Sequence, residues 1–493
     1  MLKKISELIA LLAVISIMMV SLITCPIEEI TTTTTTSIIA VLDVLHISET
    51  SSTVSNNAMT TTSTTLSSSS MSTSSTSTSS STSTTTIFNG STTSTTISNL
   101  LWNKKFNSFS VNSIFVDTSG NVYVAGDRTQ FFHFFNSKED WRIKKFNSSG
   151  IEDTTNWDKK INYGFSYQNS IFVDNSGNVY VVDIGYNLVS INSGIDWWIK
   201  KFNSSGIEDT TNWDKTVDSG GGDIVNSIFV DNSGNVYIVG IRTNLISTNI
   251  IDGIHDWWIK KFNSSGIEDT TNWDKKIYSS ESNSNSADLI FVDSSGNVYV
   301  AGTGYNLVSN NIIYNWWIKK FNSSGIEDTT NWDKKIYYGY TSPNSIFVDS
   351  SDNVYLAGSE ENYPNNIKNN WRIKKFSSSG IEDTNWDKKI NTSSQVNYNN
   401  AKSVFVDNSS NVYVGGCEFY STSSIDLWIK KFNPLGVEDT NWDKKINISS
   451  QIMPFPTTSI SVDTSGNVYA TIYGDSLNSD WLIKKFNSSG VEQ

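Results

Sequence analysis

From residue 101 onward, short apolar runs alternate with clusters of Gly, Asn, Asp and Ser. Ser170–Val173, Val179–Val182 and Trp197–Phe202 are three such runs, and Trp157–Ile161 is a fourth that ends the preceding unit. Runs of roughly four to eight residues, rich in Val, Ile, Phe, Tyr and Trp and bounded by turn residues, are typical of β-strands. The pattern predicts an all-β domain in which each unit contributes four short strands.

Three phrases recur in a fixed order and give the size of the unit. They are Val-Asp-x-Ser-Gly-Asn-Val-Tyr, a Trp ahead of Ile-Lys-Lys-Phe, and Asn-Trp-Asp-Lys-Lys. The Asp of the first phrase returns every 56–62 residues. The positions are Asp117, Asp174, Asp231, Asp293, Asp349, Asp407 and Asp463; Trp141, Trp198, Trp258, Trp317, Trp371, Trp428 and Trp481; and Trp157, Trp213, Trp273, Trp332, Trp386 and Trp442. Such a period predicts a ring of sheets.

The third phrase has six copies where the others have seven, and the missing copy stands at the start of the domain. Leu101–Lys105 reads Leu-Trp-Asn-Lys-Lys, while the last unit stops at Gln493 before this element is due. We therefore predict a seven-bladed β-propeller of four-stranded blades over residues 100–493. The N-terminal strand around Trp102 closes it by completing the last blade, which leaves no exposed edge.

The turn Gly of the first phrase and the repeated Trp each lead to a structural prediction. The turn Gly of the first phrase tolerates positive φ, but two units carry Asp352 and Ser410 in its place. Ser accepts the left-handed region poorly, so we expect the turn at Ser410 to be the most strained or to rearrange. The repeated Trp residues are interpreted as blade core. A ligand-stacking role stays open mainly for three additional ones that precede the strand Trp: Trp197, Trp257 and Trp316.

The first 25 residues predict an export signal. Lys3 and Lys4 precede the apolar stretch Leu8–Ile23, which at ~1.5 Å per residue is too short to span a bilayer. The sequence Leu-Ile-Thr-Cys ending at Cys25 resembles a bacterial lipobox, which implies lipidation of Cys25. Thr24, and Pro26 directly after the cysteine, depart from that pattern, so ordinary cleavage and an uncleaved anchor stay open.

Residues 26–99 are dominated by Ser and Thr and predict a disordered stalk. We expect an exported chain at the cell surface or outer envelope, lipid-anchored or secreted. Contact with a membrane is expected only through the N-terminal anchor.

The net charge of −13 disfavours nucleic acid as a partner, because phosphate binding needs a basic surface. Of the two cysteines, only Cys417 lies in the predicted folded part, so no disulfide is expected there.

The repeated phrases resemble the bacterial β-propeller repeat known as SBBP. The resemblance is carried by the strand phrase Ser170–Tyr180, the Lys-Phe-Asn-x-x-Gly turn at Lys201–Gly206, and the Trp strand at Trp213. It covers about 390 residues and implies a propeller, often exported, with no single biochemical activity.

Positions that vary from blade to blade are the ones free to bind a ligand. They fall in loops between the second and third strands, and between the fourth strand and the next unit; we expect both kinds of loop on one face. Aromatic residues there suit glycan stacking or a protein surface, although closing the blade ends would also explain them. The predicted ligand-contacting residues are Phe131, Phe132, His133, Phe134, Phe135, Tyr163, Tyr167, Tyr186, Tyr337 and Tyr340.

The sequence offers little for catalysis. The histidines His133 and His255 fall in loops of different blades and have no matched acid or nucleophile. Each Asp-x-Ser-Gly-Asn turn supplies one dependable carboxylate, whereas calcium takes roughly six to eight oxygens. We expect no catalytic residues, no metal and no cofactor.

Three hypotheses follow. The first is a surface-tethered binding module that recognises an extracellular glycan or protein through the variable loops. The second is a structural scaffold of the envelope, which the near-identity of neighbouring blades favours. The third and least favoured is a propeller enzyme acting on polysaccharide.

Overall fold

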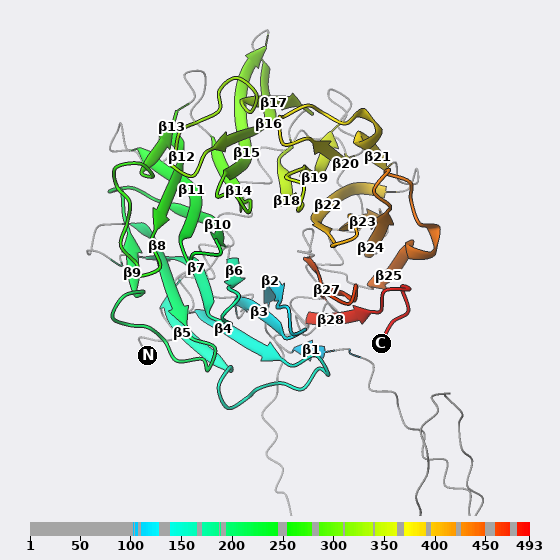
Figure 1. The fold of residues 1–493 in the computed structure, drawn as a ribbon, viewed down its shortest axis with the longest axis horizontal. Coiled ribbons are helices and arrows are strands. Elements are labelled where there is room, and N and C mark those ends of the chain that lie inside the picture. The colour runs from blue at the N-terminus through cyan, green and yellow to red at the C-terminus, as the bar shows by residue number, and fades with distance from the viewer. Residues whose placement is uncertain are drawn as a thin grey trace, which may run out of the picture. The chain divides into compact units, whose positions relative to one another are not determined.

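The computed structural model describes residues 102–493 except for 103, 107–109, 128–138, 165–169, 187, 189–193, 245–253, 279–284, 309–310, 339–340, 362–368, 391–395, 421–424, 449–458 and 474–480. The described residues form seven four-stranded antiparallel sheets arranged in a ring (Figure 1). The predicted seven-bladed β-propeller is confirmed.

Six blades each take four consecutive strands, counted from the centre of the ring outward. They are β2 (Ser110–Val116), β3 (Val122–Asp127), β4 (Glu139–Phe146), β5 (Lys159–Gly164); β6 (Ser170–Val173), β7 (Val179–Tyr186), β8 (Ile195–Phe202), β9 (Lys215–Val217); β10 (Ile224–Val230), β11 (Val236–Asn244), β12 (Ile254–Phe262), β13 (Lys275–Ile277); β14 (Ser286–Val292), β15 (Val298–Val308), β16 (Asn311–Phe321), β17 (Lys334–Tyr337); β18 (Pro343–Val348), β19 (Val354–Glu361), β20 (Asn369–Phe376), β21 (Lys388–Ile390); β22 (Val396–Val406), β23 (Val412–Tyr420), β24 (Ile425–Phe432), β25 (Lys444–Ile448). The seventh blade consists of β26 (Ile460–Val462), β27 (Val468–Tyr473), β28 (Trp481–Phe486) and β1 (Lys104–Phe106).

The ring closes as predicted, by a strand from the start of the domain. Strand β1 pairs antiparallel with β28, with Lys104 opposite Ile483 and Phe106 opposite Trp481. The backbone N–H of Trp102 donates to the carbonyl of Gln493. Because β1 occupies the outer position of the last blade, the first and last segments of the domain share one sheet.

The outer strands begin later than predicted. Trp157 lies in the turn ahead of β5, and Trp386 and Trp442 end the short 3₁₀ helices η2 (Thr384–Trp386) and η3 (Thr440–Trp442). The pairing starts at the following Lys-Lys, while the Trp side chain is buried beneath the blade edge.

The strand register corrects the assignment of the paired tryptophans. Trp197 lies opposite Val217 as Trp371 lies opposite Ile390, whereas Trp198 takes the place of Arg372. In four blades the predicted strand Trp therefore lies one residue after the repeated position: Trp198, Trp258, Trp317 and Trp428. The repeated position holds Trp141, Trp197, Trp257, Trp316, Trp371, Leu427 and Trp481.

The tryptophans hold neighbouring blades together. Trp197 packs on Trp258 with ring centroids 4.9 Å apart, and Trp257 packs on Trp317 at the same distance. All sixteen tryptophans whose side chains the structure describes are buried. The core interpretation is confirmed for them, and none of the three additional ones presents a free face to a ligand.

The turns that lack Gly keep the repeat geometry. Asp352 has φ 59° and Ser410 has φ 60°, close to the 76° of Gly177. The Ser410 N–H still donates to the Asp407 carbonyl at 2.8 Å. The turn therefore does not rearrange at Ser410. Of the two alternatives expected there, backbone strain is the one that remains.

Candidate binding site

The blade topology separates two faces of the ring. Because each blade is antiparallel, the turns between its first and second strands and between its third and fourth strands share one face, termed the constant face. The loops of differing sequence share the other, termed the variable face. Strand pairing reaches different heights there: β15–β16 extends to Val308 opposite Asn311, whereas β7–β8 ends at Tyr186 opposite Ile195. The variable face is uneven as a result, and the β15–β16 hairpin projects from the ring in Figure 1.

Most of the predicted ligand-contacting residues lie outside the part of the chain that the structure describes. Tyr163 and Tyr186 lie in β5 and β7, where only their backbone is described, and Tyr337 ends β17 with 58% of its surface exposed. Tyr278 occupies the equivalent position in the preceding blade with the same exposure and was not predicted, although the shared Lys-Lys-Ile ahead of it is a usable signal. Outside the described residues lie Cys25, Phe131, Phe132, His133, Phe134, Phe135, Tyr167 and Tyr340.

The inner strands line the ring centre with a collar of phenylalanines. One Phe from each of six blades is half-buried and contacts its neighbour, with centroids 4.7–5.1 Å apart and planes tilted by 48–55°. These tilts match the ~51° rotation between adjacent blades of a seven-fold ring. The collar consists of Phe115, Phe172, Phe229, Phe291, Phe347 and Phe405.

The spacing of the rings determines how they face the channel. At about 4.8 Å between centroids, two rings lying side by side in the wall would bring carbon atoms within roughly 2 Å of each other, inside their ~3.5–4.0 Å contact distance. Each ring must therefore lie partly over the face of its neighbour, with one edge directed toward the axis of the channel. Offset and edge-on arrangements at these distances are the favoured geometry of aromatic pairs.

The collar is open at the seventh blade. The equivalent residue there is Ser461, between Ile460 and Val462. A cavity of about 680 Å³ opens over the collar from the constant face and is lined by all six phenylalanines and by Ser461, which is buried.

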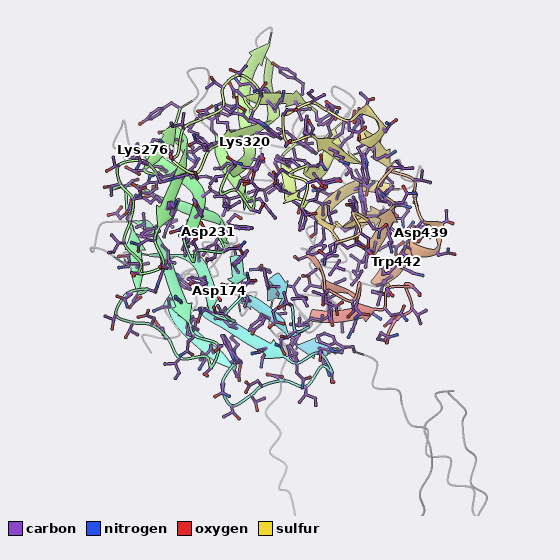
Figure 2. The ribbon with its side chains drawn as sticks, viewed as in Figure 1. Asp174, Asp231, Lys276, Lys320, Asp439 and Trp442 are labelled. Atoms are coloured by element: carbon purple, nitrogen blue, oxygen red, sulfur yellow. The ribbon has the colours of Figure 1, made fainter. Side chains whose placement is uncertain are left out.

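The Asp-x-Ser-Gly-Asn turns surround the channel on the constant face, and those of Asp117, Asp407 and Asp463 line this cavity. The turns of Asp174 and Asp231, which Figure 2 shows on the inner side of their blades, line a neighbouring cavity and have the same geometry. One Asp231 carboxylate oxygen accepts the N–H groups of Ser233 and Asn235, each at 2.9 Å. The other accepts from the Asn235 side chain at 2.8 Å and the Tyr237 hydroxyl at 3.2 Å. Burial, followed by the charge of Asp231, raises the pKa of Tyr237. Both carboxylate oxygens therefore serve the turn itself.

Nearer the variable face than the phenylalanines, the inner strands carry polar side chains. Asn226 donates to the Ala287 carbonyl and Asn344 to the Ala401 carbonyl, each at 2.9 Å, so each amide stitches its blade to the next. Two blades replace this Asn by charged residues, Asp288 and Lys402. Burial raises the pKa of Asp288 to about 7 and lowers that of Lys402. The predicted loops did not include either residue, because both belong to an inner strand.

Two further reactive side chains lie in described strands. Cys417 is buried in β23, and burial raises its thiol pKa to about 11, which leaves it a thiol at neutral pH. Burial lowers the pKa of His255 on β12. In the described part of the chain, no three His, Cys, Asp or Glu side chains gather so as to hold a metal ion. Nor does that part contain a helix with the length and apolar character needed to cross a bilayer.

Comparisons with known proteins reach the fold only. No protein-family model matches the chain, and no curated protein matches its sequence. A protein of unknown function from Dyadobacter fermentans is 8% identical over 78% of this chain and 98% of its own, with a TM-score of 0.42. The β-propeller domain of the Trilobed protease from Pyrococcus furiosus is 10% identical over 77% and 94%, with a TM-score of 0.42.

A third similar structure is Drosophila Semaphorin 1a, extracellular domains 1–2, which is 9% identical over 78% of this chain and 86% of its own at a TM-score of 0.41. That the repeats of this chain belong to the SBBP type, as the sequence suggests, stays a prediction.

Proposed function

We propose that the chain is an exported binding module that recognises an extracellular glycan or protein through the loops of its variable face. The observation that carries this proposal is the contrast between repeated and variable positions. Polar groups that repeat in every blade are engaged in bonds within or between blades, while sequence variation is concentrated at one face.

The repeated Lys-Lys pair illustrates the engaged set. The buried Lys319 Nζ pairs with Glu327 and lies 3.0 Å from Asp333. Its neighbour Lys320 lies 4.8 Å from the ring centroid of Tyr299, on the other side of the sheet. A buried, hydrogen-bonded ion pair fixes geometry, and a cation over an aromatic ring is stabilising. Neither lysine is available to a ligand without loss of stability.

The variable face has the opposite character. Tyr278 and Tyr337 expose 58% of their surfaces at the ends of the outer strands of neighbouring blades. Exposed aromatic side chains with a polar tip supply large contact area at low entropic cost. The hairpins around them differ in length, from six paired residues in β3 to eleven in β15, which suits recognition of one shape.

The test is a screen of the purified full chain against glycan and extracellular-matrix arrays. A variant with Phe131, Phe132, Phe134 and Phe135 changed to Ser runs beside it, and Tyr337→Ser is a second variant. The matched control is Ile267→Ser, since Ile267 is 66% exposed in a turn of the constant face.

We expect a ligand whose binding falls at least tenfold in a variable-face variant and is unchanged in Ile267→Ser. Loss of binding in the control alone would place recognition on the constant face. Absence of any ligand for a folded protein would contradict the proposal and favour the scaffold hypothesis.

Anchoring of the module is a separate part of the proposal. If Cys25 is lipidated, cells producing the chain should incorporate a palmitate analogue into it, and Cys25→Ala should abolish the label. Equal labelling of Cys25→Ala would show that the resemblance to a lipobox is misleading.

A further inference from the structure

The phenylalanine collar has seven-fold geometry but six rings. Adjacent rings lie in contact from Phe115 around to Phe405, in the order of the blades. The seventh place is held by Ser461, whose side chain has no ring. The collar is thus a complete stacking arrangement with one member missing.

The missing place has the dimensions of one aromatic ring. With neighbours about 4.8 Å apart on a seven-fold circle, the two rings that flank Ser461 stand about 9 Å apart, twice the usual aromatic spacing. One ring inserted between them would contact both Phe405 and Phe115 at the distance that the other five contacts use. A saturated chain of similar volume would fill the gap without reproducing those ring contacts.

The cavity at this place is larger than one ring and is open to solvent. It extends over all six phenylalanines of the collar and has a volume of about 680 Å³. Beside Ser461 it is lined by the turn Asp463–Gly466, with Ser465 exposed, and by the turn residue Ser488. Hydroxyl and backbone groups around an apolar floor suit a ligand whose ring is attached to a polar chain.

We infer that the vacancy at Ser461 is a binding site for an aromatic side chain presented by a peptide or protein segment, which completes the collar from the constant face. This site lies on the opposite face from the one assigned to recognition above. It stands or fails independently of that proposal.

The test uses ligand-observed saturation-transfer NMR on the full chain with N-acetylphenylalaninamide, N-acetyltryptophanamide and N-acetylleucinamide. We expect saturation of the aromatic protons of the first two probes, with affinity in the millimolar range that a single side chain reaches. The leucine probe should bind at least fivefold more weakly.

The key variant is Ser461→Phe, which supplies the seventh ring from the chain itself. It should raise the melting temperature and weaken the aromatic probes at least tenfold. The matched control is Ser205→Phe, the same substitution at an exposed turn residue away from the collar. It should leave binding unchanged.

A third variant keeps the test decisive if Ser461→Phe fails to fold. Phe291→Ser opens a second gap, between Phe229 and Phe347, and should about double the number of sites for the aromatic probes. Undiminished binding in a folded Ser461→Phe, equal loss in Ser205→Phe, no second site in Phe291→Ser, or equal binding of the leucine probe would each overturn the inference.

Discussion

At the scale of single residues, Ser410 shows how far the repeat can impose a conformation on an unsuitable side chain. Six of its equivalents are Gly or Asp, and Ser410 adopts the same left-handed backbone with φ 60°. The hydrogen bonds of Asp407 to Ser409 and Asn411, at 2.9 and 2.8 Å, hold the turn in place. The cost of the left-handed region remains in the folded state.

Replacing Ser410 by Gly should relieve that cost. We expect the free energy of unfolding to rise by about 0.5–1 kcal/mol, after the greater freedom of Gly in the unfolded chain is subtracted. Asp352→Gly should gain less, because Asp tolerates this region better. Urea unfolding of both variants checks the prediction, and a loss of stability in Ser410→Gly would show that the serine contributes a contact that offsets its strain.

The buried carboxyl of Asp288 should make the stability of the fold depend on pH. Burial raises its pKa to about 7, above the value near 3.9 of an unfolded chain. Between about pH 4 and 7 the folded state keeps a proton that the unfolded chain has released, so stability falls as the pH rises through this window and is level above it. The Ser286 hydroxyl donates to the carboxylate, and the Asn226 amide lies 3.3 Å from it.

Asp288→Asn installs the amide that Asn226 and Asn344 carry at the equivalent place. Relative to the natural chain, the variant should gain roughly 1–4 kcal/mol in free energy of unfolding between pH 4 and pH 8. Thermal or urea unfolding across this range measures the difference. A difference that does not change with pH would mean that Asp288 titrates normally.

At the scale of elements, the blades are joined by tryptophans of the outer edge. The Trp386 indole N–H donates to the Pro434 carbonyl at 3.2 Å, reaching into a turn of the next blade. Trp442 does the same toward Ser488 at 3.1 Å. Both side chains are fully buried, so each bond lies in a region where an unmade hydrogen bond is costly.

This arrangement allows a matched pair of variants. Trp386→Phe keeps an aromatic ring but removes the donor and should lower the free energy of unfolding by about 1–2 kcal/mol more than Trp273→Phe. Trp273 is equally buried, but its indole N–H has no hydrogen-bond partner. Equal losses in the two variants, measured by urea unfolding, would show that the inter-blade bond adds nothing to ring packing.

The elements were largely predictable from the sequence because each blade repeats the same strand and turn signals. The failures have local causes. The double tryptophans misled the assignment because Trp197 and Trp198 both precede Ile, and only the pairing of Trp197 with Val217 distinguishes them. The collar was missed because Phe115 stands in an apolar Ile-Phe-Val run that resembles buried core, while its ring edges line the channel.

At the scale of the whole molecule, the ring depends on one strand contributed from the start of the domain. Trp102 is buried and packs on Phe146 and Tyr469, from the first and the last blades. The count of phrases and the shape of Leu101–Lys105 predicted this closure. The variable face could not be predicted to the same depth, since its loops have no repeat to constrain them.

Trp102→Ala should test the closure. We expect a loss of about 3–5 kcal/mol, comparable with Trp442→Ala at the equivalent place in the sixth blade. Amide hydrogen exchange in β28 should also rise, because β1 is its partner. A loss below about 1 kcal/mol with unchanged exchange would mean that β1 does not close the ring.

The claim that recognition resides on the variable face is tested most directly by hydrogen exchange of the full chain with and without the strongest ligand from the array screen. Protection should appear in the loops between β3 and β4 and between β17 and β18, and in the β15–β16 hairpin. Protection confined to the Asp-x-Ser-Gly-Asn turns around the collar would contradict the claim.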